Sequence, residues 1–160
     1  MDFGKIMFPH PEDQADYEYP EDGLLQAFDV IQPEEIRNPK QLDANGEQCL
    51  LVVKRGLTTG TTIGRITGME SFTRNFKEYG IEEISMEIAV LPYGNTKGPF
   101  SAPGDSGSIV LDRKGRIVGM LNGGAGSTDR TDITYLTPYW YIDAEVKKYF
   151  PKSFLYEVVK

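Results

Sequence analysis

Short apolar runs with a period of two dominate the chain from residue 49 onward, and they constrain its fold more than any other feature. Side chains of a β-strand point alternately to the two faces of a sheet, so this period predicts strands. Glycine-containing turns separate the runs, as expected where a chain reverses between neighbouring strands. Short strands at this spacing predict an antiparallel barrel or sandwich. The runs are Cys49 to Val53, Thr61 to Thr67, Ile84 to Leu91, Ser108 to Leu111 and Ile117 to Leu121.

The two ends of the chain differ from this central part. Residues 1–47 are rich in proline and acidic residues, which predicts an extended segment, with one apolar run from Leu24 to Ile31 as either a short strand or a docking segment. Near the C-terminus, Ile142, Val146, Tyr149 and Phe150 fall on one helical face. We therefore expect one domain, with a barrel over 48–150 that ends in a helix, and a tail over 151–160.

The segment from Phe100 to Val110 places a serine between two glycines, directly after an aspartate. A serine hydroxyl attacks a carbonyl efficiently when a tight backbone turn aims N–H groups at the oxyanion that forms. Gly104 and Gly107 supply the conformational freedom that such a turn needs. The alternative interpretation is a polar turn between two strands, because Gly, Asp, Ser and Pro are common in turns of every kind.

The string Gly104-Asp105-Ser106-Gly107-Ser108 resembles the active-serine motif of the chymotrypsin-like (trypsin-like, PA-clan) serine peptidases. As in that family, a hairpin follows, and its second strand, Ile117 to Leu121, leads into the glycine-rich run Asn122 to Gly126. The segment Val53 to Thr67 is similar to a hairpin of intracellular fungal and bacterial members. The resemblance covers residues 48–150 and implies a single six-stranded antiparallel Greek-key barrel, the second half of a trypsin-like double barrel, with a C-terminal helix.

The resemblance also implies roles for individual residues. Ser106 would be the nucleophile, and the backbone N–H groups of Gly104 and Ser106 would form the oxyanion hole. Asp105 and Gly107 would support the loop. Phe100 would lie at the base of the substrate pocket, whose wall would contain Asn122, Gly123 and Gly124. An aromatic floor without a carboxylate predicts a preference for apolar or small side chains in a polypeptide substrate, and no cofactor or metal is implied.

A catalytic base and its acid are the parts of this family's triad that the sequence does not supply. In this family the triad residues follow one another along the chain in the order His, Asp, Ser. The single histidine, His10, follows only nine residues and lies between Pro9 and Pro11, so we expect a surface residue. Glu87 lies in the strand that leads to the serine loop, so we expect an outward-facing strand residue and assign it no triad role.

The sequence therefore predicts the nucleophile-bearing half of a serine endopeptidase, inactive or weakly active by itself. An N-terminal barrel or a partner chain would supply the histidine and the aspartate. The chain could be a piece of a longer enzyme, one half of a split enzyme, or a pseudoenzyme. The last case is the alternative function, a non-catalytic interaction domain.

Composition limits the partners and the compartment. The chain has 17 Lys and Arg against 24 Asp and Glu, a formal net charge of −7, which argues against binding to nucleic acids and to anionic membranes. No run is long and apolar enough to span a membrane, and residues 1–9 lack the pattern of a signal peptide. The single cysteine, Cys49, excludes a disulfide within the chain, so we expect an intracellular, cytoplasmic location. Asp43 to Glu47 has the composition of a calcium loop, but a tight turn explains it better, and we expect no metal.

Overall fold

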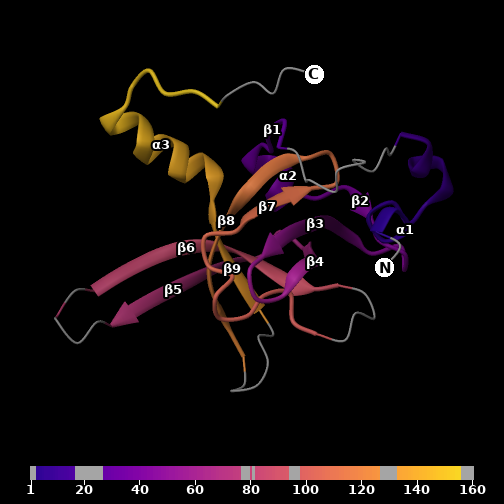
Figure 1. The fold of residues 1–160 in the computed structure, drawn as a ribbon, viewed down its shortest axis with the longest axis horizontal. Helices are drawn as coiled ribbons and strands as arrows, with labels where there is room; N and C mark the ends of the chain where they lie inside the picture. The colour runs from indigo at the N-terminus through magenta and orange to yellow at the C-terminus, as the bar shows by residue number, and fades with distance from the viewer. Residues whose placement is uncertain are drawn as a thin grey trace.

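Six antiparallel strands close on one another to form a barrel (Figure 1). The structure, a computed structural model, describes residues 3–16, 27–76, 80, 82–93, 98–126 and 133–155. The predicted fold class is therefore confirmed. In order around the barrel, the strands are β3 (Gln48–Gly56), β4 (Gly60–Ile66), β6 (Glu82–Pro92), β9 (Ile133–Pro138), β8 (Arg116–Ala125) and β7 (Ile109–Asp112), which pairs again with β3.

The order of the strands gives the barrel a Greek-key topology. Strands β7, β8 and β9 are sequential antiparallel neighbours, and β6 lies beside β9, on the far side from β7. The chain must therefore cross from β6 to β7 through residues 93–108. This connection contains the predicted nucleophile loop, so the topology places the loop where β7 begins.

A hairpin and several short elements surround the barrel. Strand β5 (Glu70–Phe76) pairs with the first half of β6, and this hairpin extends away from the barrel (Figure 1). Short helical elements interrupt the N-terminal stretch that the sequence predicts to be extended. They are α1 (Phe3–Met7), η1 (Pro11–Asp16) and α2 (Pro33–Arg37), and two short strands accompany them, β1 (Asp29–Val30) beside β8 and β2 (Gln41–Leu42) beside β3.

The strand β1 lies within the apolar run from Leu24 to Ile31. Asp29 and Val30 pair in parallel with β8, and Ile31 is buried in the core. For this part of the run the strand alternative therefore agrees with the structure. Residues 24–26 lie outside the described residues.

Two apolar clusters make up the core, and β3 contributes to both. Leu50 and Val52 belong to the larger cluster, in the barrel interior, whereas Cys49, Leu51 and Val53 pack on the outer face against Met7 and Phe8 of the N-terminal segment. Both faces of this strand are thus covered, which explains why its apolar run is continuous. The remaining members of the larger cluster are Ile31, Ile36, Ile66, Ile88, Val90, Phe100, Val110, Val118, Leu121 and Leu136.

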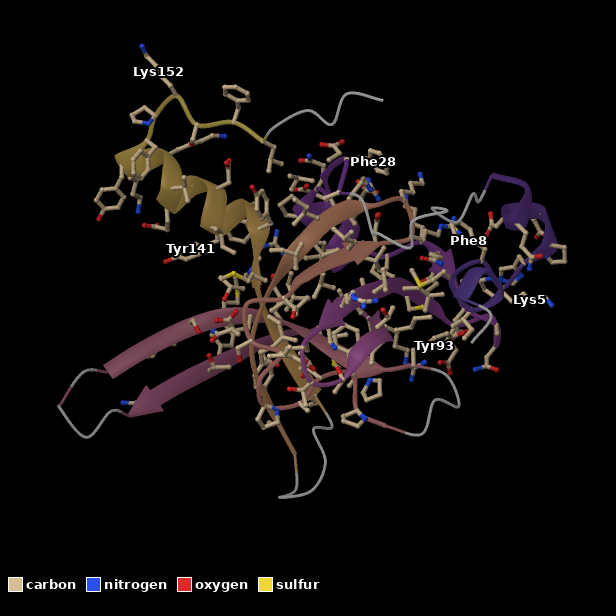
Figure 2. The ribbon with its side chains drawn as sticks, viewed as in Figure 1. Lys5, Phe8, Phe28, Tyr93, Tyr141 and Lys152 are labelled. Atoms are coloured by element: carbon tan, nitrogen blue, oxygen red, sulfur yellow. The ribbon has the colours of Figure 1, made fainter. Side chains whose placement is uncertain are left out.

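The C-terminal helix α3 (Tyr139–Tyr149) follows β9 directly and extends away from the barrel (Figure 1). None of its residues is buried. Tyr141 projects from the helix, as Figure 2 shows, and Val146 and Tyr149 are also exposed. The apolar face that the sequence predicts for this helix is therefore largely open to solvent. Among the described residues, no helix combines the length and the apolar composition that crossing a membrane requires.

Candidate active-site loop

Ser106 lies exposed in the turn that precedes β7. Gly104 and Gly107 flank it with φ angles of 102° and 86°, in the region that L side chains rarely adopt. The glycines that the sequence singles out are therefore required by the backbone of the turn. Between them the chain brings the side chain of Asp105 inward, where it is buried, and leaves that of Ser106 outward.

Backbone hydrogen bonds hold this turn against the barrel. Within the turn, Asp105 N donates to Ala102 O over 3.0 Å and Ser108 N donates to Asp105 O over 3.1 Å. After the serine, Gly107 N donates to Leu121 O over 2.8 Å, and Leu121 N donates to Ser108 O over 2.9 Å. The turn is thus joined to β8 immediately beside Ser106.

The Asp105 carboxylate fixes the turn from inside the molecule. It accepts hydrogen bonds from Thr58 N over 2.7 Å, from Thr59 N over 3.2 Å and from Thr59 Oγ1 over 2.6 Å, all in the turn between β3 and β4. It also accepts one from Ala102 N over 3.1 Å. Burial by itself would raise the pKa of this carboxyl, but these hydrogen bonds outweigh burial and hold the pKa below its ordinary value. Asp105 thus joins the Ser106 turn to the β3–β4 turn, and its support of a catalytic loop stays a prediction.

Lys54 is the cation that faces Asp105. Its Nζ lies 3.1 Å from Asp105 Oδ2, and both side chains are fully buried. The ammonium group also donates to Thr59 Oγ1 and, over 3.2 Å, to Gly60 O. Burial lowers the pKa of Lys54, and the hydrogen bond and charge of Asp105 oppose that shift.

The backbone N–H groups of Gly104 and Ser106 differ from their bonded neighbours in the turn in their hydrogen bonding. Within the described part of the chain, neither Gly104 N nor Ser106 N donates a hydrogen bond to a protein acceptor. The Ser106 hydroxyl likewise has no partner there. Because the neighbouring groups are bonded, these two amides and this hydroxyl are available to a ligand.

The predicted pocket wall begins one residue beyond the point where the turn joins β8. Gly123 and Gly124 pair with Tyr135 and Thr134 of β9, while the pairing of β8 with β7 ends at Met120. Past that point the other edge of β8 has no strand partner among the described residues. The bonds of Leu121 to Gly107 and Ser108 thus bring this part of β8 to the Ser106 turn, and the role of Asn122 to Gly124 as a pocket wall stays a prediction.

Glu87 does not face solvent, contrary to expectation. Its exposed fraction is only 2%, and its Oε1 accepts a hydrogen bond of 3.1 Å from Asn122 Nδ2. Its other oxygen has no partner among the described residues. Alternation along β6 places the neighbouring Ile88 in the barrel core, so Glu87 is on the other face of the strand, where the region around Asn122 covers it.

Phe100 belongs to the barrel core. Its exposed fraction is 1%, and its ring lies so close to Gly64 that no side chain could be accommodated there. The adjacent Ser101 hydroxyl is joined to Thr134 Oγ1 of β9 over 2.7 Å. The beginning of the loop is therefore anchored in the interior, and contact between Phe100 and a substrate stays a prediction.

His10 lies far from Ser106 along the barrel. It connects α1 and η1, and η1 is joined to the far end of β7 by an ion pair of 2.8 Å between Asp13 and Arg113. Figure 2 shows Phe8 of the same segment on the opposite side of the molecule from α3. Because Ser106 precedes β7 and Arg113 follows it, the four-residue strand, about 10 Å long, separates the two ends. His10 is also partly buried, with no partner for Nε2 among the described residues.

Sequence reasoning missed the residues that support the turn from the barrel, namely Lys54, Thr58 and Thr59. The pattern Lys-x-Gly-x-Thr-Thr-Gly is visible in the sequence from residue 54 to residue 60. Its contact with a loop some 50 positions later depends on the closure of the barrel, which no local pattern reports.

The cavity found among the described residues does not coincide with the Ser106 turn. An open cavity of about 590 Å³ lies at the far end of β7, lined by residues of mixed charge from α2, β2 and the β7–β8 turn. In the described ranges, no group of three or more His, Cys, Asp or Glu is placed to hold a metal ion. Asp43 instead accepts hydrogen bonds from Asn45 N and Glu47 N, over 2.8 and 3.0 Å, in a tight turn.

Comparison with known proteins gives a distant structural likeness. No protein-family model matches the chain, and no curated protein matches it. Among solved structures, the chain is similar to the passenger domain of plasmid-encoded toxin, an autotransporter enterotoxin from enteroaggregative Escherichia coli. The identity is 19% and the TM-score 0.49, over 82% of this chain but only 16% of that one. A likeness this remote carries no argument about activity.

Proposed function

We propose that this chain is the nucleophile-bearing half of a serine endopeptidase of the chymotrypsin-like type. The observation that carries the proposal is the exposed Ser106, held in a turn in which the N–H groups of Gly104 and Ser106 have no acceptor among the described residues. A turn that served only to connect two strands would not require a buried aspartate bonded from several sides. The barrel supplies the rigid frame that such a site needs.

The proposed chemistry is acyl transfer. Ser106 Oγ attacks the carbonyl carbon of a peptide bond and loses its proton to a base, while the carbonyl oxygen becomes negatively charged. The N–H groups of Gly104 and Ser106 donate hydrogen bonds to that oxygen. The C–N bond then breaks as the amine receives a proton, and water hydrolyses the resulting ester at Ser106. Charge that develops near preorganised amides is stabilised in the transition state.

The free edge of β8 supports an extended polypeptide as the substrate. Gly123, Gly124 and Ala125 pair with β9 on one side, and their other edge has no strand partner among the described residues, so a peptide in β conformation can add to that edge. That edge begins next to the Ser106 turn. We propose that it positions the acyl side of the substrate, with apolar or small side chains at the cleaved position.

The base must come from outside the described arrangement. His10 is held at the far end of β7, and it is the only histidine of the sequence. Glu87 is bonded to Asn122, on a strand of the same barrel, and we assign it no triad role. We propose that another barrel or another chain supplies the histidine and the aspartate, and that the isolated chain has little or no activity.

Imidazole can replace the missing base in a direct test. The chain is incubated with a biotinylated alkyl fluorophosphonate at increasing imidazole concentrations, and the adduct is located by mass spectrometry. In this reaction an O–P bond forms at the serine, the P–F bond breaks, and imidazole takes the hydroxyl proton. We expect labelling of Ser106 that rises with imidazole and is abolished in Ser106→Ala.

Ser108→Ala is the matched control, because Ser108 lies in the same loop and is partly exposed. It should label like the wild type. Labelling spread over several serines, or a Ser106 rate no greater than that of other exposed serines, would contradict the proposed function.

A non-catalytic interaction domain is the second candidate. The exposed aromatic side chains of α3 favour it, since an apolar helix face open to solvent is a common mark of a protein interface. The two candidate functions differ in whether they require the Ser106 hydroxyl. A binding module would retain its partner in Ser106→Ala and would show no imidazole-dependent labelling.

A further inference from the structure

Strand β5 forms one end of the sheet. Among the described residues it pairs only with β6, so its other edge has no strand partner there. The hairpin that contains it extends away from the barrel (Figure 1). Natural proteins commonly protect such an edge with a proline, a bulge or a covering element. Residues 70–76 contain no proline, and their register with β6 has no shift, so this edge has neither of the first two protections.

The pairing with β6 determines which backbone groups of β5 point to the open edge. Ala89 N donates to Met69 O over 3.3 Å, which extends the β5–β6 register by one pair. In an antiparallel ladder every second residue directs both its N–H and its C=O to the neighbouring strand. The odd-numbered residues of β5 therefore face β6. The N–H and C=O groups of Glu70, Phe72 and Arg74 point away from it, toward the open edge.

The side chains of these three residues lie exposed on one face of the hairpin. Phe72 is 78% exposed, and Glu70 and Arg74 are exposed on either side of it. Ile84, opposite Arg74 on β6, is a second exposed apolar side chain on this face. Alternation from the core residue Ile88 identifies the face as the one that lines the barrel interior. It loses its cover where the hairpin leaves the barrel.

The order of residues along β5 is complementary to itself in the antiparallel direction. Residues 70–74 read Glu-Ser-Phe-Thr-Arg. Two copies centred on Phe72 would place Glu70 of each opposite Arg74 of the other. Ser71 would lie opposite Thr73, and the two Phe72 side chains would meet at the centre. Opposite charges and aromatic residues that face each other across two strands stabilise their pairing. In the same register the outward-pointing N–H and C=O groups of the two strands meet as hydrogen-bonded pairs.

From this complementarity we propose that β5 is a dimerisation strand, whose occupant is β5 of a second copy of this chain. The two open edges pair antiparallel across a twofold axis at Phe72, and the two hairpins become one continuous sheet. A twofold axis repeats every contact, so one self-complementary patch is sufficient for a closed dimer. This inference is independent of the proposed function, because it uses none of the residues of the Ser106 turn.

Three features of the chain limit the strength of this dimer. Glu70 Oε1 already accepts a hydrogen bond of 3.0 Å from Arg37 Nε, and Arg74 takes part in an interaction within its own chain. The new ion pairs therefore replace existing interactions in part. Each copy also has a formal net charge of −7, which opposes association. Pairing over residues 70–74 alone gives an interface at the small, weak end of the known range, so we expect a dissociation constant of about 10–100 µM.

The test exchanges the two charges of the strand. In Glu70→Arg both ends of the paired strands would have two cations, and in Arg74→Glu they would have two anions. Each variant by itself should therefore stay monomeric. An equal mixture of the two variants restores opposite charges at both ends and should form a heterodimer. The double variant Glu70→Arg/Arg74→Glu should dimerise like the wild type, although it loses the exposed ion pair with Arg37.

Phe72→Glu tests the centre of the interface, because it places like charges opposite each other at the axis. Phe154→Glu is the matched control, since it introduces the same charge at an aromatic residue that is 81% exposed and lies outside the hairpin. Sedimentation equilibrium measures the dissociation constant of each protein over two decades of concentration around the expected value. It is carried out at about 0.15 M salt, where charges more than about 8 Å apart are screened. A thermal melt of each variant checks that it is folded.

We expect Phe72→Glu to raise the dissociation constant at least about tenfold and Phe154→Glu to leave it unchanged. A wild-type chain that stays monomeric over this range would overturn the proposal. So would a dimer that persists in folded Glu70→Arg or Arg74→Glu, or a mixture of these two variants that does not associate. A dimer that is lost in Phe154→Glu and retained in Phe72→Glu would place the interface near the C-terminus and would also overturn it.

Discussion

At the scale of single residues, the Asp105 carboxyl makes stability depend on pH. Its pKa in the folded chain lies below the ordinary value of 3.8, so the folded state binds this proton less readily than the unfolded chain. The stabilisation it contributes is complete above the unfolded pKa and is lost as the pH falls toward the folded pKa. We therefore expect the chain to lose stability in acid, in part because Asp105 must take up a proton.

The variant Asp105→Asn tests whether Asp105 contributes to this dependence of stability on pH. Near pH 7 the substitution should destabilise the fold by about 3–5 kcal/mol, because it leaves the Lys54 ammonium buried without its counter-charge. The difference from the wild type should shrink as the pH falls below about 4, where the Asp105 carboxyl of the unfolded wild-type chain begins to protonate while that of the folded chain does not. Urea unfolding of both proteins between pH 7 and pH 3 measures this difference in the free energy of unfolding. A difference that stayed constant over this range would contradict the assignment.

Asn122 supports a second buried carboxylate. Its side-chain amide is the hydrogen-bond partner of Glu87, whose other oxygen has no partner among the described residues. Asn122→Ala should therefore cost about 1–3 kcal/mol of unfolding free energy, although Asn122 itself is exposed. In Glu87→Gln no charge is buried, so adding Asn122→Ala to that variant should cost less. Equal costs in the two backgrounds, measured by chemical denaturation, would show that the pair does not interact.

At the scale of elements, the fit between the β3–β4 turn and the Ser106 turn depends on Gly56. Gly56→Ala introduces a methyl group against the Asp105 carboxyl group without changing any charge. We expect a loss of about 1–3 kcal/mol from overpacking, together with altered amide signals at Gly104 and Ser106.

Gly98→Ala is the comparison, since none of the described residues lies within 4 Å of its added methyl group and its φ is not positive. It should leave both the stability and the turn unchanged. A Gly56→Ala protein with wild-type stability and unchanged turn signals would mean that the two turns have room that this geometry lacks.

At the scale of the whole molecule, the parts that sequence could predict are those with local causes. Short apolar runs identify five barrel strands, although the run of β3 is continuous rather than alternating, and positive φ angles explain the glycines of the Ser106 turn. Strand β5 was not predicted, because Glu70–Phe76 is largely polar and its hairpin partner, rather than a core, holds it in place. Similarly, Lys54 and Asp105 are 51 positions apart, and only the closed barrel brings them together.

The difference between local and tertiary causes also explains why the sequence did not predict the burial of Glu87 or the structure of the N-terminal segment. A glutamate in an alternating strand suggests a solvent-facing position, but burial depends on what covers that face, and here Asn122 of another strand lies over it. Met7 and Phe8 pack on the outer face of β3, so part of an acidic, proline-rich stretch is held by tertiary contacts rather than by local propensity.

Helix α3 gives the barrel little support. No residue of the helix is buried, and Tyr149 and Phe150, which adjoin its end, are 80% and 67% exposed. Replacing both by serine should therefore change the unfolding free energy by less than about 0.5 kcal/mol, since surface substitutions without buried contacts have small effects. Removing two exposed aromatic rings should also reduce any concentration-dependent self-association through α3. Thermal melts at two protein concentrations measure the stability, and light scattering on the same samples measures the self-association. A melting temperature lowered by several degrees would show that α3 packs against the barrel.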